Sequence, residues 1–188
     1  ITTEEFKRIL YALRTRPHKH QIRDRALLTV CALLGLRAKE LISIRYGDLR
    51  LSDDPPLIDV LTAKQREAKK RLIFDDMAVP PSALKALKEF ISTVDKSKRQ
   101  PWSRVFRMTT RQAGRLFKTY SKIAGLNPKY SIHCLRHFRG MRVYEETKDL
   151  VQVRESLRHK NLTSTQIYLH AHDHHKINAR IDVEEDEA

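Results

Sequence analysis

Cysteine is scarce in this sequence, and long apolar runs are missing. Two cysteines among 188 residues are too few for a framework of disulfide bonds. The longest apolar stretch, Ala26 to Leu36, is interrupted by Thr29 and Gly35 and falls well short of the roughly 20 residues that span a bilayer. The N-terminus shows no signal-peptide pattern. These absences exclude a disulfide-rich secreted domain and a transmembrane protein, and we expect an intracellular, cytoplasmic setting that keeps thiols reduced.

Negative charge is in the minority. The chain has 37 lysines and arginines against 23 aspartates and glutamates, which gives a formal net charge of +14 and a pI near 10.0. This excess is larger than solubility requires, and it predicts a polyanionic partner. Nucleic acid is the leading candidate, and an anionic membrane surface is the lesser alternative.

Helical patterns dominate the chain. Thr2 and Glu5 form a capping-box pattern ahead of an apolar face, and Pro17 ends that helix. Gly35 suits the end of a second helix that begins near Gln21. A short helix over about 38–44 follows at once and places Arg37 near its N-terminal end. Further helices are expected near 81–94, 113–124, 131–138, 150–157 and 163–169.

Residues 48–74 follow a different pattern. Apolar stretches at 49–51, 57–61 and 71–74 are separated by turn-forming residues, which predicts a small three-stranded antiparallel sheet. The segment from Thr62 to Lys70 joins the last two strands and is strongly basic. It is either a solvated loop or a finger that contacts phosphates. The chain is therefore predicted to be mainly α with one small sheet, an α+β class, without internal repeats or an internal domain boundary.

Basic residues and one tyrosine gather in the last third of the sequence. His133 and Arg136 are three residues apart and share one face of a helix, and His159 and Tyr168 follow. Each alone is most simply a structural residue. Together they supply the types that phosphoryl transfer without a metal needs. Arginine matches phosphate oxygens with a fixed fork of donors, histidine moves protons near neutral pH, and tyrosine can form a covalent intermediate.

Four ordered motifs resemble those of the tyrosine recombinases, or phage-type integrases. The order and spacing agree with that family from Arg37 to Tyr168. The motifs are Gly35-Leu36-Arg37-Ala38-Lys39-Glu40-Leu41, His133-Cys134-Leu135-Arg136-His137, Leu157-Arg158-His159 and Ser164-Thr165-Gln166-Ile167-Tyr168-Leu169-His170. Any one of these motifs would be a weak signal, whereas four in order are a strong one.

The resemblance implies roles for five of these residues. Tyr168 would attack the scissile DNA phosphate, giving a 3′-phosphotyrosine link and a free 5′-hydroxyl. Arg37 and Arg136 would clamp the non-bridging oxygens. His133 and His159 would hydrogen-bond the phosphate, and His133 would also handle the proton of the nucleophile.

The resemblance also implies a lysine on the sheet hairpin that protonates the leaving 5′ oxygen. Lys64 is the first choice, and Lys69 and Lys70 remain alternatives. Other cations are expected to contact DNA: Lys39, Arg66, Lys69, Lys70, Arg71, Arg139 and Arg158. Two single positions and one short segment depart from the family pattern. Arg158 stands where glycine is usual, Lys39 replaces a common serine, and the segment Phe138-Arg139-Gly140 differs from the usual small residues.

The resemblance implies that residues 1–188 form a single catalytic domain and that the N-terminal DNA-binding domain of the family is absent. Residues 172–188 would be a tail that contacts a neighbouring protomer and ends in a mobile acidic segment. The chain is expected to be a monomer in solution and a homotetramer on double-stranded DNA. No membrane partner, ATP, metal or other cofactor is expected.

Three alternatives remain open from the sequence. The chain could be a non-catalytic DNA-binding module with the same fold, or it could relax DNA as a type IB topoisomerase does. A metal site is the third, from His170, His172, His174 and His175, of which the first and third have i, i+4 spacing; no suitable carboxylate or cysteine partner is evident. The biological role implied by the family is integration of a viral or plasmid genome, excision, or resolution of chromosome dimers.

Overall fold

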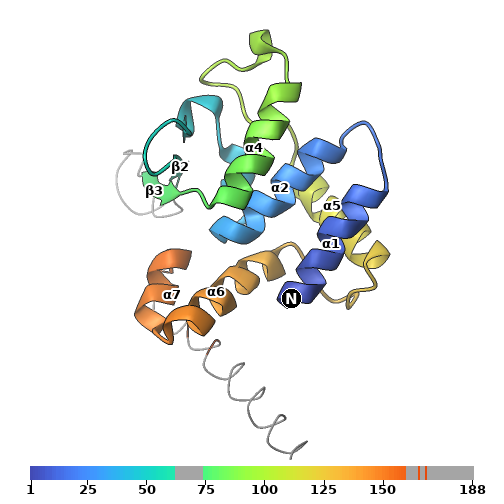
Figure 1. Cartoon of the computed structure of the whole chain (residues 1–188), viewed down its shortest axis with the longest axis vertical. Helices are drawn as coiled ribbons and strands as arrows, with labels where there is room; N and C mark the ends of the chain where they lie inside the picture. Colours follow the sequence, from blue (N-terminus) through green and yellow to red (C-terminus); the bar gives the residue numbers. More distant parts are fainter. Residues whose placement is uncertain (62–73, 160–164, 166–167, 169–188) are drawn as a thin grey trace, which may run out of the picture. The chain divides into compact units, whose positions relative to one another are not determined.

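The computed structural model describes residues 1–61, 74–159, 165 and 168. The elements within these residues are α1 (Thr3–Thr15), α2 (Gln21–Leu34), α3 (Ala38–Ser43), η1 (Tyr46–Asp48), β1 (Leu49–Arg50), β2 (Leu57–Leu61), β3 (Phe74–Ala78), α4 (Pro81–Thr93), η3 (Lys96–Lys98), α5 (Thr110–Ile123), α6 (His133–Thr147) and α7 (Leu150–Leu157) (Figure 1). The prediction of a mainly helical chain with one small antiparallel sheet is confirmed. The chain divides into two compact units, residues 1–138 and 139–188, which are described separately.

Local sequence signals define the ends of the first helices. The Thr2 hydroxyl accepts a hydrogen bond from the Glu5 amide at 3.1 Å, and the Thr2 amide donates to the Glu5 carboxylate at 2.8 Å. The predicted capping box is therefore confirmed, and a cap of this kind contributes about 1 kcal/mol. Gly35 ends α2 in the left-handed region at φ 63°, which glycine adopts without strain from a side chain.

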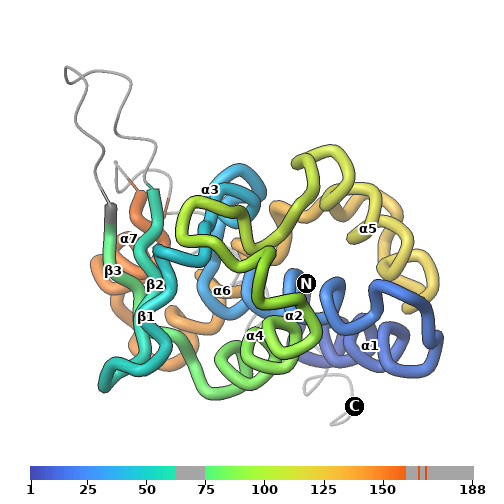
Figure 2. Tube along the Cα trace, turned by 90° about the horizontal axis from the view of Figure 1, so that it is seen from above, coloured from blue at the N-terminus to red at the C-terminus, as the bar shows by residue number. Residues whose placement is uncertain are grey.

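The core of the first unit is built around α2. This helix is buried on most of its circumference, since it packs against α1, α3 and α4. In Figure 2, α3 and α5 lie along one side of the first unit and α1 and α4 along the other. The tight turn at Gly35 and the buried Leu36 lead directly into α3, so that Arg37 stands at the start of this helix.

The sheet has the order β1-β2-β3 with antiparallel pairing. The third strand, β3, covers Phe74–Ala78. The predicted strand at 71–74 meets it at Phe74, residues 71–73 lie outside the described part of the chain, and residues 75–78 were not predicted to be strand. Asp76 interrupts the apolar pattern there and lies opposite Asp59 of β2. Like charges in that arrangement repel each other, and Arg50 offsets the repulsion by pairing with Asp59 at 2.7 Å and with Asp76 at 2.8 Å.

The second unit contains the later part of α6 and all of α7. The predicted helix that carries His133 extends to Thr147, and the one predicted at 150–157 is confirmed as α7. Asp149 caps α7 by accepting a hydrogen bond from the Val151 amide at 2.7 Å. Val143, Tyr144, Val153, Leu157 and Tyr168 form its apolar cluster. In the described part of the chain, every helix is too short or too polar to cross a membrane.

Candidate active site

Arg37 is held at the N-terminal end of α3 by Glu40. The backbone amide of Arg37 donates to Glu40 Oε2 at 2.9 Å, and its guanidinium Nη1 donates to Glu40 Oε1 at 2.7 Å. Glu40 is buried, whereas the Arg37 side chain keeps 39% of its surface exposed. The carboxylate therefore fixes one part of the guanidinium and leaves another part open to an anion.

Arg136 enters the same cluster from α6. Its side chain is 1% exposed, its Nη1 donates to the Gly35 carbonyl at 2.6 Å, and Nη1 lies 3.9 Å from Glu40 Oε2. A buried cation requires such partners, because desolvation of an unpaired charge is costly. Glu40 thus ties both predicted phosphate-binding arginines together. Glu40 belongs to the first motif, but its residue type and spacing alone did not predict this role.

His133 begins α6 beside these arginines. It is exposed at the surface of the first unit, yet partial desolvation of the ring lowers its pKa, and the positive charges of Arg136 and Arg37 lower it further. The His137 ring meets that of His133 edge-on at 4.9 Å, and burial is the main cause that lowers its pKa as well. Neutral imidazoles are therefore favoured at pH 7, and a neutral imidazole can accept a proton.

Cys31 does not add a nucleophile to this cluster. It is fully buried in α2, and desolvation, followed by the charge of Glu40, raises the pKa of its thiol to about 12. Since the thiolate is the reactive form, Cys31 is a packing residue of the core.

His159 and Tyr168 belong to the second unit. His159 Nδ1 lies 3.1 Å from the hydroxyl of Thr165, whose side chain is fully buried. This hydrogen bond fixes the orientation of the imidazole through Nδ1. The Tyr168 side chain is 1% exposed and packs in the apolar cluster of its unit. Thr165 belongs to the motif that contains Tyr168, but its hydrogen bond to His159 could not be predicted from the sequence.

Arg158 explains why glycine is usual at its position in the family motif. It follows α7 with φ 54°, in the left-handed region. Its amide bonds to the Glu155 carbonyl and the His159 amide to the Arg154 carbonyl, both at 2.9 Å. This is the C-terminal capping pattern that favours glycine. An L-residue with a side chain adopts it at a cost of about 1–2 kcal/mol.

The predicted DNA-contacting residues lie in different environments, and several of them fall outside the described part of the chain. Lys39 is exposed on α3. Arg139 is half-buried and donates to the Ser156 hydroxyl at 3.3 Å, and burial lowers its pKa. These contacts lie within its own unit, so an additional role toward DNA stays a prediction. Several predicted residues lie outside the described part of the chain: Lys64, Arg66, Lys69, Lys70, Arg71, the four histidines from 170 to 175, and the tail 172–188.

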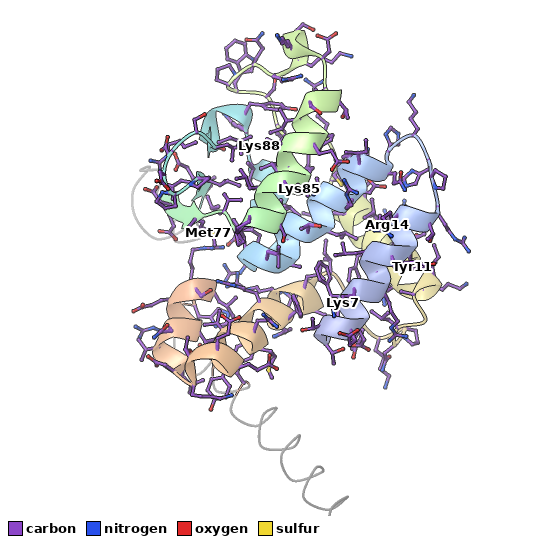
Figure 3. The ribbon with its side chains drawn as sticks, in the orientation of Figure 1. Lys7, Tyr11, Arg14, Met77, Lys85 and Lys88 are labelled. Atoms are coloured by element: carbon purple, nitrogen blue, oxygen red, sulfur yellow. The ribbon has the colours of Figure 1, made fainter. Side chains whose placement is uncertain are left out.

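A cavity of about 480 Å³ lies elsewhere, between α1, α2 and α4. Figure 3 shows Lys7, Tyr11 and Arg14 on α1 and Lys85 on α4, all of which line it. None of the residues that line the cavity is a predicted site residue. The helix α3, which begins after Arg37, lies on the other side of the first unit (Figure 2). We do not assign it to catalysis. Across the residues that the structure describes, no three His, Cys, Asp or Glu side chains form a group able to hold a metal ion.

The model of the phage integrase family matches residues 1–175. The chain belongs to this family. All six predicted catalytic residues of this integrase-family chain, from Arg37 to Tyr168, lie within the matched range. The predicted membership of the tyrosine recombinases is confirmed.

Curated relatives of this integrase-family chain carry the name tyrosine recombinase. It is 32% identical over 167 residues to tyrosine recombinase XerD of Rickettsia prowazekii, covering 82% of this chain and 53% of that protein. It is 30% identical over 181 residues to tyrosine recombinase XerC of Caldanaerobacter subterraneus, covering 92% of this chain and 47% of that protein. The chain therefore spans about half the length of the curated relatives it matches.

Solved structures show the same fold. The post-cleavage complex of XerH recombinase with a palindromic difH substrate aligns with a TM-score of 0.75 and 19% identity, over 98% of this chain and 53% of that chain. XerA recombinase aligns with a TM-score of 0.72 and 23% identity, over 89% of this chain and 58% of that chain. The predicted catalytic-domain fold of the tyrosine recombinases is thereby confirmed.

Proposed function

We propose that this chain is the catalytic domain of a site-specific tyrosine recombinase, which breaks and rejoins double-stranded DNA through Tyr168. The observation that carries the proposal is the cluster of Arg37, Glu40 and Arg136 with the neutral imidazole of His133 beside it. It presents the partly exposed guanidinium of Arg37 to phosphate oxygens, with the buried Arg136 held beside it and a proton acceptor next to both.

The cleavage step exchanges one phosphate ester for another. The Oη of Tyr168 attacks phosphorus, the phosphorus–Oη bond forms, and the phosphorus–O5′ bond breaks. The proton of the phenol passes to His133, and a hairpin lysine, Lys64 in our assignment, gives a proton to O5′. Attack by a second 5′-hydroxyl reverses these transfers and releases Tyr168. The phosphotyrosine keeps the energy of the ester, so religation needs no ATP.

The cations reduce the two main costs of this chemistry. A phenol with a pKa of about 10 is roughly three units from ionisation at pH 7, which corresponds to about 4 kcal/mol. Positive charge near the phenolate reduces this cost. Arg37, Arg136 and His159 are assigned as donors to the non-bridging oxygens, where negative charge develops in the transition state. We assign no metal or other cofactor to the reaction.

Double-stranded DNA is the proposed partner. The net charge of +14 suits a polyanion. The structurally similar XerH recombinase has been solved bound to a difH substrate, and lambda integrase has been solved as a dimer bound to a COC′ core site. We propose one catalytic domain over residues 1–188, a monomer in solution and a homotetramer on DNA, in an intracellular, DNA-associated location. Integration of a viral or plasmid genome is the proposed role, with chromosomal recombination as the alternative.

Two other functions make different predictions in one experiment. The protein is incubated with supercoiled plasmid and with a nicked duplex, quenched in detergent and separated on a gel. A covalent band on the nicked duplex that disappears in Tyr168→Phe and persists in Tyr11→Phe supports the proposal. Tyr11 is a suitable control because its side chain is 64% exposed. Relaxed plasmid without strand exchange between duplexes would favour the topoisomerase. Salt-sensitive DNA binding without a covalent band would favour the non-catalytic module.

A further inference from the structure

Gly140 occupies the interior of α6 (His133–Thr147). Glycine is a poor residue for a helix interior, because it loses the most conformational freedom when the helix forms. Its backbone is helical, so no left-handed turn requires a glycine here. The residue therefore calls for another explanation, and the contacts in the second unit supply one.

The ring of Tyr168 rests on the α6 backbone at Gly140. A Cβ atom at residue 140 would lie 2.4 Å from Cζ, 2.6 Å from Oη and 2.7 Å from Cε1 of Tyr168. Carbon atoms in favourable contact are about 3.5–4.0 Å apart. Any larger residue would therefore push the hydroxyl end of the ring out of its position.

Apolar side chains of α6 and α7 form part of the surroundings of this position. Val143 and Tyr144 of α6 and Val153 and Leu157 of α7 pack with Tyr168, whose side chain is 1% exposed. A reacting phosphate has to approach within about 3–3.5 Å of the nucleophilic oxygen. A phenol that is almost fully enclosed leaves no room for a phosphate in a DNA strand, so the ring must leave Gly140 before it can attack.

We propose that Gly140 is a positioning residue for Tyr168, and that it provides a seat which holds the phenol away from DNA until cleavage. The role of Tyr168 as nucleophile rests on the proposed function, whereas the seat is a property of the free protein. The two can therefore be tested separately. The matched control is Gly114 within α5, where an added Cβ would have no neighbour within 4 Å.

The first test measures access to the phenol. The full chain is treated with N-acetylimidazole, which acetylates accessible tyrosines, and each tyrosine is followed by peptide mass spectrometry. Tyr11, 64% exposed, and Tyr144, 9% exposed, are internal references. In the wild type, Tyr168 should react at least about tenfold more slowly than Tyr11, which corresponds to a seat favoured by about 1.4 kcal/mol. Gly140→Ala should bring Tyr168 close to the rate of Tyr11, and Gly114→Ala should not change it.

Three outcomes of this test would overturn the seat. The first is wild-type Tyr168 that reacts as fast as Tyr11, a result that does not depend on the folding of any variant. The second is unchanged acetylation of Tyr168 in Gly140→Ala. The third is acetylation of Tyr144 that rises in step with Tyr168, because the whole apolar cluster would then have opened.

The second test measures cleavage in a single turnover on a nicked duplex. Gly140→Ala should form the covalent complex up to about tenfold faster, since the withdrawn state no longer reduces the fraction that can react. Its DNA affinity should equal that of Gly114→Ala. Slower cleavage at equal affinity would show that the seat holds Tyr168 in a productive position and would contradict the proposal. Absence of a covalent complex in every protein would refute the proposed function, and acetylation would still decide on the seat.

Discussion

Replacing Glu40 by glutamine removes the negative charge that Arg37 and Arg136 share, with little change in shape. Glu40 is 5% exposed and Arg136 is 1% exposed, so water does not substitute for the lost charge. Two unit charges at the observed 3.9 Å interact by about 4 kcal/mol at an effective dielectric constant of about 20.

Two retained contacts moderate the expected loss. Removing one partner of a buried ion pair costs about 3–5 kcal/mol. In Glu40→Gln, Arg136 keeps its bond to the Gly35 carbonyl, and the glutamine oxygen can still accept from the Arg37 amide. We therefore expect a loss at the lower end of this range, a decrease of about 3 kcal/mol in the free energy of unfolding. With a urea dependence of about 2 kcal/mol per molar, the midpoint falls by roughly 1.5 M.

The assay is urea unfolding followed by circular dichroism, and the chain contains a matched control. Glu4 pairs with Lys7 at 2.7 Å with i, i+3 spacing, as Glu40 does with Arg37, but the Glu4 and Lys7 side chains are 76% and 66% exposed. Glu4→Gln should cost less than about 1 kcal/mol. Equal midpoints for the two variants, or a Glu40→Gln variant within about 1 kcal/mol of the wild type, would refute the account of the buried cluster.

Two further predictions concern the histidines. The pKa values of His133 and His137 are lowered in the folded chain. The unfolded chain therefore binds more protons below about pH 6.5, and stability falls as the pH drops through that range. The difference between the urea midpoints at pH 7.5 and pH 5.5 should be smaller in His137→Gln than in the wild type, and an unchanged difference would contradict the assignment. Thr165→Val removes the hydrogen bond to His159, so we expect roughly tenfold slower cleavage at unchanged DNA affinity. Thr165→Ser should restore the rate, and wild-type cleavage by the valine variant would exclude the orienting role.

Features set by neighbouring residues could be predicted from the sequence. The capping box of Thr2 and Glu5 and the left-handed Gly35 depend on contacts within a few residues, and both signals carry their own chemistry. The residues of the ordered motifs were likewise recognisable from their types and order. The structure adds that Arg136, from a distant part of the chain, donates to the Gly35 carbonyl and lies beside Glu40, which also binds Arg37.

Features set by distant partners could not be predicted. The sequence did not predict a strand at residues 75–78, where two aspartates interrupt the apolar pattern, and the pairing of Asp76 with Arg50 across the sheet offsets that charge. The double role of Glu40 depends on Arg136, which comes from another helix. A glutamate between Leu36 and Leu41, both buried, was the available signal. Gly140 was noticed as a departure from the family pattern, but its reason is the ring of Tyr168.

The central claim is that Tyr168 becomes covalently linked to DNA. The most direct measurement is to trap the complex on a nicked duplex labelled at one end, digest protein and DNA, and identify the modified peptide by mass spectrometry. We predict a nucleotide joined through a 3′-phosphate to the peptide that contains Tyr168, and a free 5′-hydroxyl on the other fragment. A nucleotide on any other residue, or a linkage through a 5′-phosphate, would contradict the account.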